Sequence, residues 1–418
     1  MTRLIQMPNG LRIVAESIPS VRSIAFGIYV KNGSRNEKKE TNGISHFIEH
    51  MFFKGTEKRQ ASDIADEMDA IGGQMNALTS KEYTCYYTRT LDSHFDIALD
   101  ILSDMFFNSK FDDQEIQKER GVIIEEINMY DDLPDELVHE ILQSSIWQDS
   151  ALGYPILGDA STISTFNNST FKAFYHSNYH PHNTVIALAG NFEIDEAAKK
   201  IEQYFGQFDR QHSYEKPSLK TEYKPCVVTK EKDVEQVHIS FGFPSIPLGS
   251  EEAYDLAVLN TIFGSGMSSR LFQKIREEHG LAYSVYSANS SYTDTGLYYI
   301  YAGLNRSHTE KTIQLVLEEI KRLEDEPIGE EQLARTKEQL KSNYLLSQES
   351  TSTRMSNLGR GMIMLNRILT PEEIIRKIES VTTERIDDLV KRIFKLEQMS
   401  FSAVGNIGGF NFEEILHR

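Results

Sequence analysis

A short segment near the start of the chain carries two histidines and a glutamate at spacings that suit metal chemistry. The segment reads His46-Phe47-Ile48-Glu49-His50. Residues three and four positions apart lie on one face of an α-helix, so His46, Glu49 and His50 would point to the same place. Two imidazoles at this spacing can bind one zinc ion, and the carboxylate between them can act as general base on a metal-bound water. This H-x-x-E-H order is a candidate zinc protease signature, and a polar helix surface is the alternative.

A later helix offers a third ligand. The segment from Asp113 to Asp131 has an apolar face that includes Ile116, Ile123, Ile127 and Tyr130. At helical spacing Glu119 and Glu126 fall within this face, whereas Glu125 falls on the polar side. A catalytic zinc commonly has three protein ligands, and an inward carboxylate needs a compensating partner. We therefore predict that Glu126 is the third ligand and that Glu119 orients a histidine or its water. The alternative is that both glutamates reach solvent at the rim.

The elements around these residues follow from periodicity and turn signals. We expect the motif helix from about Gly43 to Phe53, with Asn42 as a possible cap and Gly55 as a stop. Other helices are expected at 62–71 and 194–205, and strands at 4–7, 11–16, 23–30, 74–79, 83–90 and 183–189. Pro134 should break or kink the glutamate helix before another helix ends near Trp147.

The second half of the chain repeats this order of elements. A polar stretch with two prolines predicts a linker at 211–224 between domains at 1–210 and 225–418. Strands are expected at 226–243, 283–290, 296–304 and 400–404, with helices at 250–263, before His279 and within 309–350. Both halves end a strand in Gly-Asn, at Gly190-Asn191 and Gly405-Asn406. The predicted fold class is α+β, with two similar domains that arose by duplication, each a mostly antiparallel sheet flanked by helices.

Composition narrows the classes of partner. The 418 residues carry a net charge of −18, which argues against nucleic acid and anionic membranes as partners. Two cysteines are too few for a disulfide framework, and the first residues do not resemble a signal peptide. No stretch approaches eighteen uninterrupted apolar residues. We expect a cytoplasmic protein with no membrane partner.

Three stretches together resemble a known family, the inverzincin metallopeptidases that include pitrilysin, insulin-degrading enzyme and mitochondrial processing peptidase. The stretch His46-Phe47-Ile48-Glu49-His50-Met51-Phe52-Phe53-Lys54-Gly55-Thr56 is similar to the family's zinc helix. Glu119 and Glu126 match its paired glutamates. The number of residues between His50 and Glu126 in the sequence resembles that of the processing-peptidase branch and its bacterial members. The resemblance extends over essentially the whole chain, including Gly73-Gln74-Met75-Asn76-Ala77.

The resemblance implies further site residues. It implies one zinc ion per chain, an exposed edge strand at Asn76 and Ala77 that pairs with the substrate backbone, and a substrate contact at Phe53. It also implies that Arg276 and Tyr283 hold the substrate carbonyl as hydrogen-bond donors. Without the family, Arg276 would be interpreted as a cation on a helix surface and Tyr283 as an aromatic residue of a strand.

We therefore expect a zinc metalloendopeptidase that hydrolyses unfolded or short peptides in a chamber, with Glu49 as general base. Family members of this length look like half of the larger enzymes, so a homodimer would enclose the chamber, and Arg276 and Tyr283 would face the partner's zinc. Two alternatives are a maturation protease for one precursor peptide and a non-catalytic scaffold subunit of the same family.

Overall fold

The computed structural model describes residues 2–209 and 221–416 and divides into two compact units. The described residues of the first unit are 2–127, 154–209 and 346–369, and those of the second are 128–153, 221–345 and 370–416. Packing therefore does not follow the contiguous domains that the sequence predicted at 1–210 and 225–418. Most of the predicted linker, 211–220, lies outside the described residues.

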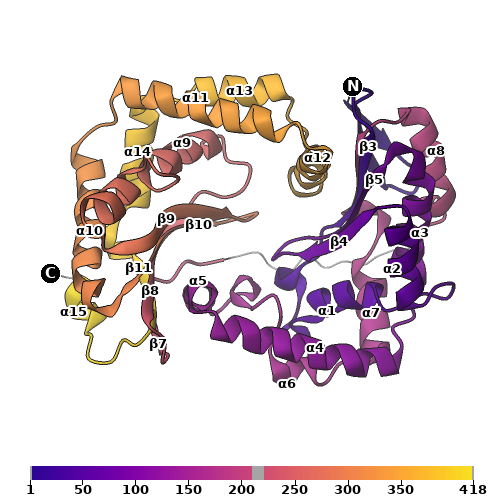
Figure 1. Cartoon of the computed structure of the whole chain (residues 1–418), viewed down its shortest axis with the longest axis horizontal. Coiled ribbons are helices and arrows are strands. Elements are labelled where there is room, and N and C mark those ends of the chain that lie inside the picture. Colours follow the sequence, from indigo (N-terminus) through magenta and orange to yellow (C-terminus); the bar gives the residue numbers. More distant parts are fainter. Residues whose placement is uncertain (1, 210–220, 417–418) are drawn as a thin grey trace. The chain divides into compact units, whose positions relative to one another are not determined.

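The first unit is built on a six-stranded sheet in the order β1-β2-β6-β3-β5-β4. Its strands β3, β5 and β4 are labelled in Figure 1. All neighbouring strands are antiparallel except β2 and β6. The strands are β1 Thr2–Gln6, β2 Arg12–Ser17, β3 Ser23–Val30, β4 Gln74–Thr79, β5 Thr84–Leu91 and β6 Thr184–Gly190. Its helices are α1 Ile44–Phe52, α2 Ala61–Ala70, α3 Phe95–Asn108, α6 Ala160–Ile163, α7 Asn168–Asn178, α8 Ile194–Phe205 and α12 Thr351–Leu365, and α4 Asp113–Asp132 begins in it.

The second unit is built on a five-stranded sheet in the order β7-β11-β8-β10-β9. Only β7 and β11 are parallel. The strands are β7 Val227–Glu231, β8 Gln236–Ser245, β9 Ala282–Ser291, β10 Gly296–Asn305 and β11 Ser400–Gly405. Its helices are α5 Pro134–Ile146, α9 Ala253–Phe263, a π-helix at Phe272–Glu278, α10 Thr309–Asp325, α11 Glu330–Ser347, α13 Pro371–Glu379, α14 Thr383–Ile393 and α15 Phe412–Leu416.

Apart from the additional strand β1 in the first sheet, the two sheets have the same topology. In chain order, β2 to β6 of the first sheet correspond to β7 to β11 of the second, and both sets are arranged first-fifth-second-fourth-third. In each set the first and fifth strands form the parallel pair. This identity confirms the predicted α+β class with two similar, mostly antiparallel sheets, and it is the arrangement that duplication of one unit produces.

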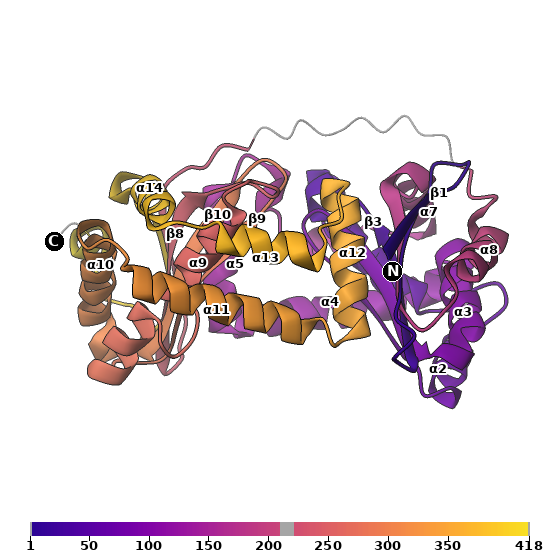
Figure 2. The same cartoon turned by 90° about the horizontal axis from the view of Figure 1, so that it is seen from above.

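Each unit also takes a helix from the other half of the sequence. In the first unit, α12 packs against β2, β3 and β6 (Figure 2). A Cβ atom on Gly359 of α12 would lie 2.2 Å from the ring of Tyr29, so glycine is what lets this helix approach β3. In the second unit, α5 packs against β8 and β11 and buries Val138 and Leu142. These exchanged helices explain why the packing units are not contiguous in sequence.

Most strands lie within a few residues of their predicted bounds. The helices between Thr351 and Ile393 were not predicted, although they include α12, which covers the first sheet. Among the described residues, no helix is both long enough and apolar enough to cross a membrane.

Candidate metal centre

Helix α1 carries the H-x-x-E-H segment and is packed against the core of the first unit by its apolar side. Ile44, Phe47, Ile48 and Met51 follow helical spacing and are each at most 1% exposed. This packing leaves His46, Glu49 and His50 on the remaining side of the helix. Burial of one face thus fixes the direction in which the three polar side chains point.

The N-terminal end of α1 is held by a residue that sequence reasoning missed. The Glu37 carboxylate accepts hydrogen bonds from the backbone N–H of Gly43 at 2.7 Å and of Ser45 at 2.8 Å. Asn42, predicted as a possible cap, instead donates its side-chain amide to Glu37 at 2.9 Å, and Gly43 is the N-cap at φ +94°. The prediction was wrong because the acceptor that satisfies the helix N–H groups comes from a separate turn.

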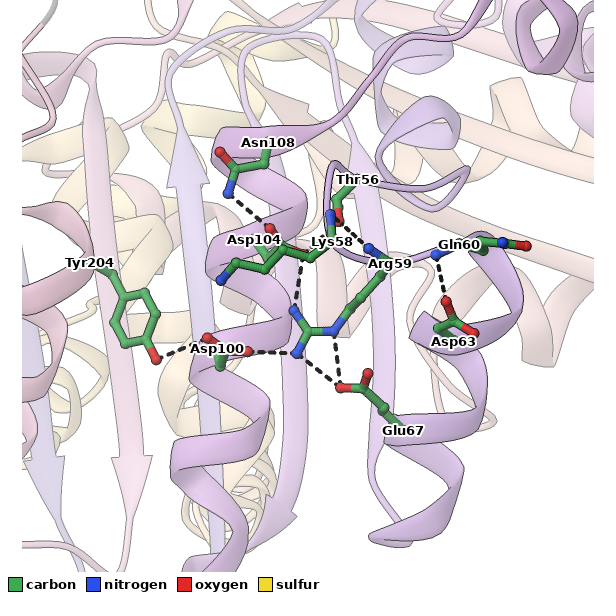
Figure 3. A network of polar contacts seen from close by, with 10 residues as sticks. All are labelled: Thr56, Lys58, Arg59, Gln60, Asp63, Glu67, Asp100, Asp104, Asn108 and Tyr204. Atoms are coloured by element: carbon green, nitrogen blue, oxygen red, sulfur yellow. Dashed lines mark hydrogen bonds and ion pairs between the residues drawn. The ribbon is translucent and has the colours of Figure 1, made fainter.

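The chain after α1 is anchored by a polar network around Arg59 (Figure 3). Thr56 Oγ1 donates to Asp104 Oδ2 at 2.6 Å, and Arg59 Nη1 donates to the same oxygen at 2.9 Å. Arg59 also pairs with Glu67 of α2 and Asp100 of α3, at 2.9 and 2.6 Å. Both ends of the motif helix are therefore tied to neighbouring elements, which restricts movement of its side chains.

The structure brings His46, His50 and Glu126 together, with one ligand atom from each within 4.8 Å of the others. Nε2 of His46 lies 3.7 Å from Glu126 Oε2, and Nε2 of His50 lies 3.6 Å from the same oxygen. These separations are too long for hydrogen bonds. Ligands about 2.1 Å from a tetrahedral zinc lie roughly 3.4 Å apart, so the three side chains fit a zinc ion.

Protonation of His46 also suits a metal ligand. Burial, together with the nearby His50, lowers the pKa of His46 to about 3, although Glu119 acts in the opposite direction. The imidazole is then neutral at physiological pH and offers a lone pair to a cation.

The glutamates of α4 point as the periodicity predicted. Glu119 is 4% exposed and Glu125 is exposed, with Glu126 between these extremes. Glu119 Oε1 lies 2.8 Å from Nδ1 of His50. Glu119 was predicted to orient either a histidine or its water, and in the structure it contacts the histidine. Burial raises the pKa of Glu119, but hydrogen bonds from His50 and Lys54 outweigh this and hold the pKa below its usual range.

Glu49 lies beside the three candidate ligands without being one of the group. It accepts a hydrogen bond from Thr79 Oγ1, at the end of β4. Burial raises the pKa of Glu49 above its usual range. The hydrogen bond from Thr79 and the nearby His50 act in the opposite direction but do not outweigh burial. Thr79 was missed because no local pattern marks a residue that acts across thirty positions of sequence.

Strand β4 forms an edge of the first sheet, as the family resemblance implied. Asn76 is exposed, and its side-chain oxygen accepts the N–H of Ala77 at 2.8 Å. Phe53 is half-buried and packs against the core of the unit. The roles of Asn76, Ala77 and Phe53 in substrate binding stay predictions.

Arg276 and Tyr283 lie together in the second unit, each on irregular backbone. Arg276 belongs to the π-helix Phe272–Glu278 rather than to an ordinary α-helix. Tyr283 is the extra residue of a β-bulge in β9, because Gly303 pairs with Ser284 and Leu304 with Ala282. Tyr283 is 78% exposed, and the Arg276 guanidinium lies 4.9 Å from the centre of its ring. Such irregularities are frequent at functional sites, and the role of this pair stays a prediction.

Comparison with known proteins agrees with this fold. Residues 12–160 match the family model described as insulinase (peptidase family M16), and residues 165–340 match the model described as the peptidase M16 inactive domain. The second match fits a half that lacks an H-x-x-E-H segment.

The chain is 45% identical over 389 residues to the uncharacterized zinc protease YmxG of Bacillus subtilis (strain 168), an alignment that covers 92% of this chain and 94% of that protein. It is 39% identical over 395 residues to an uncharacterized zinc protease of Rickettsia felis, covering 93% and 94% of the two chains.

Among solved structures, a protease from Helicobacter pylori matches with a TM-score of 0.90 at 19% identity, over 97% of this chain and 99% of that one. A Pseudomonas fluorescens structure described as a peptidase M16 inactive domain also has a TM-score of 0.90 at 19% identity, over 97% and 98%. These two likenesses concern the fold. The curated relatives and the family models show that this chain belongs to the pitrilysin/insulinase family of metallopeptidases, peptidase family M16.

Proposed function

We propose that this protein is a zinc endopeptidase that hydrolyses unfolded or short peptides held in an extended form. The observation that carries the proposal is that Glu49 interacts electrostatically with His50 and Glu126 but does not belong to the group of His46, His50 and Glu126. A carboxylate that is not used as a ligand is free to exchange protons with a substrate or a water. One zinc ion per chain is part of the proposal, and the names of the curated relatives support zinc as the metal.

Substrate binding would use the edge strand β4. An extended peptide can add to an open edge through main-chain hydrogen bonds, which place little demand on its sequence. Thr79, at the end of this strand, donates a hydrogen bond to Glu49. A peptide bound along β4 would thus run toward the proposed base.

The chemistry would be general acid–base catalysis by Glu49. A bound zinc ion would supply polarisation of the scissile carbonyl and a lowered pKa for an attacking water. Glu49 would accept a proton as the water oxygen bonds to the carbonyl carbon, and would return it to the amide nitrogen as the C–N bond breaks. The products are a carboxylic acid, which then releases its proton, and an amine, and Glu49 is regenerated.

Two further parts of the proposal come from the family resemblance. The protein would act as a homodimer that encloses a chamber, and Arg276 and Tyr283 would donate hydrogen bonds to the substrate carbonyl oxygen. The exposure of Tyr283 and its stacking under Arg276 support a role in binding rather than in folding.

The test compares Glu49→Gln with Glu125→Gln, a matched loss of one carboxylate on an exposed surface. Zinc content is measured by elemental analysis, and hydrolysis is followed with a mixed peptide library. Glu49→Gln should keep its zinc and lose roughly 10²- to 10⁴-fold in rate, whereas Glu125→Gln should behave as wild type. Cleavage at the wild-type rate by Glu49→Gln would refute the assigned base.

The library also separates the alternatives. A wild-type protein that cleaves many unrelated peptides is a general peptidase, and cleavage confined to one sequence pattern indicates a dedicated maturation protease. Zinc-loaded wild type that cleaves nothing would favour the scaffold subunit and would overturn the proposal.

A further inference from the structure

Lys54 lies just beyond the motif helix and contacts the carboxylate that supports His50. Its Nζ is 2.6 Å from Glu119 Oε2, and the other oxygen of that carboxylate, Oε1, is 2.8 Å from Nδ1 of His50. Lys54 follows His50 by four positions, about one helical turn. The lysine and the histidine thus hold the two oxygens of one glutamate, the histidine from the last turn of α1 and the lysine from just beyond it.

Burial makes this arrangement sensitive to the loss of either partner. The side chain of Glu119 is 6% exposed, and that of Lys54 is 29% exposed. A buried acceptor that loses a partner is left unsatisfied, which is costly in free energy, and more so when the acceptor is charged. With both oxygens held, the plane of the carboxylate is fixed. With one held, the group can turn about its terminal bond and leave His50.

The two candidate histidine ligands differ in this respect. Nδ1 of His46 is buried and has no hydrogen-bond partner in the part of the chain that the structure describes. Nδ1 of His50 faces Glu119. A neutral imidazole bonded to a carboxylate carries its proton on that nitrogen, which leaves the other nitrogen free for a metal.

We propose that Lys54 is a positioning residue of the metal centre: by holding Oε2 of Glu119, it keeps Oε1 on Nδ1 of His50 and so directs Nε2 of His50 toward Glu126. The inference rests on the proposed metal centre, but not on the reaction proposed there. Sequence reasoning assigned no role to this lysine.

Electrostatics and positioning predict opposite effects when Lys54 is replaced. The ammonium group is a positive charge beside a site for a cation, so its repulsion alone would weaken zinc binding, and its removal would strengthen it. Loss of the tether would instead free Glu119 and weaken zinc binding. The sign of the change in zinc affinity therefore separates the two effects.

The test uses Lys54→Met, Lys54→Arg and the control Lys58→Met. Lys58 lies in the same loop (Figure 3). Within residues 2–209 and 221–416 its side chain forms no ion pair. Zinc affinity is measured by competition with a chromophoric chelator. Supporting residues of this kind change affinity by roughly 10- to 100-fold, so Lys54→Met should bind zinc that much more weakly. Lys54→Arg should restore most of the affinity, and Lys58→Met should match wild type.

A second readout follows the ring of His50 directly. Nitrogen NMR of ¹⁵N-histidine-labelled, metal-free protein reports which ring nitrogen carries the proton. Wild type should show the Nδ1–H form of His50, and Lys54→Met should show a mixture of the two forms. If Lys54→Met does not fold, Lys54→Gln, which removes the charge but keeps a polar end group, takes its place in both measurements.

Two results would overturn the inference: zinc affinity in Lys54→Met that equals or exceeds that of wild type, or an unchanged tautomer of His50. Neither readout needs hydrolysis. A protein that shows the expected affinities and tautomers but cleaves no peptide would contradict the proposed function and leave the role of Lys54 standing.

Discussion

Glu125 and Glu126 are neighbours in the chain with opposite surroundings. Glu125 is exposed to solvent, whereas Glu126 Oε2 lies within 3.7 Å of Nε2 of both His46 and His50. A helix turns by about 100° per residue, so two adjacent side chains cannot both face the same group. At the scale of single residues, direction rather than identity decides which carboxylate is available to a metal.

Replacing Glu126 by glutamine should weaken zinc binding more than the roughly 10- to 100-fold typical of residues outside the ligand shell, because an anionic ligand is lost. Glu125→Gln removes the same charge one position away and should leave the dissociation constant within about threefold of wild type. Chelator competition measures both variants. Equal losses in the two would show that net charge, rather than coordination by Glu126, governs the affinity.

The sequence predicted the residues whose partners lie on the same helix face or share a periodic pattern. His46, Glu49 and His50 follow from spacing, and the inward direction of Glu119 and Glu126 follows from the apolar stripe of α4. Thr79, Glu37 and Lys54 were missed as parts of the site. Each acts on a side chain or N–H group of another segment or turn, and which polar groups meet there depends on how the segments pack.

At the scale of elements, the site depends on a helix held at its two ends and on an open strand beside it. Glu37 and the network around Arg59 fix α1. The outer edge of β4 is open to a further strand, because β4 pairs with β5 on one side and with no other strand of the sheet on the other side. Sequence periodicity predicted both elements, but not the helices between Thr351 and Ile393. One of these, α12, packs in the first unit, and which helix crosses between the halves is a property of the packing.

The cap of α1 predicts a dependence of stability on pH. Burial raises the pKa of Glu37 to about 7 from an ordinary 4.5, although hydrogen bonds from Ser45, Asn42 and Gly43 act in the opposite direction. A carboxyl group with a raised pKa takes up a proton on folding. The stabilisation from this proton uptake is therefore complete at pH values below the pKa of Glu37 in the unfolded protein. It is lost as the pH rises through the pKa of Glu37 in the folded protein, and the loss in unfolding free energy is at most about 3 kcal/mol.

Urea denaturation of metal-free protein at about pH 5 and about pH 8 measures this contribution when wild type is compared with Glu37→Gln. From the lower to the higher pH, the unfolding free energy of wild type should fall more than that of Glu37→Gln, because the variant has no proton to exchange at this position. Identical pH dependence in both proteins would contradict a titrating Glu37.

The open edge of β4 predicts an alternation in substrate requirements. Along an extended peptide, successive N–H groups point to opposite sides, so only every second one could bond to β4. Single N-methylation of a cleavable peptide should raise KM strongly at alternate positions and weakly between them. A scan of methylated peptides in steady-state kinetics gives the pattern. Uniform tolerance along the peptide would exclude binding by strand addition.

At the scale of the whole molecule, one topology occurs twice with different chemistry. The first unit carries the candidate metal ligands, and the second carries Arg276 and Tyr283. Duplication of one unit would explain the shared sheet order, and the different residues of the two copies would allow the division of roles proposed above. A homodimer in which each metal centre is completed by the partner is the arrangement proposed above.

Mixing two inactive variants tests that arrangement. Glu49→Gln lacks the proposed base, and Arg276→Ala lacks the proposed carbonyl donor. In mixed dimers with sites completed across the interface, one of the two sites would be intact, so a statistical mixture should recover roughly a quarter of wild-type hydrolysis. A mixture of Glu49→Gln with His50→Ala should recover none. No recovery in the first mixture would place Arg276 with the metal centre of its own chain.

The central claim is that His46, His50 and Glu126 bind one zinc ion on which peptide hydrolysis depends. The most direct measurement titrates zinc into metal-free protein while cleavage of the peptide library is followed. The proposal predicts no cleavage at the start, a linear rise, and a plateau at one zinc ion per chain. Cleavage that proceeds fully without added metal, or no cleavage at any ratio of zinc to chain, would contradict it.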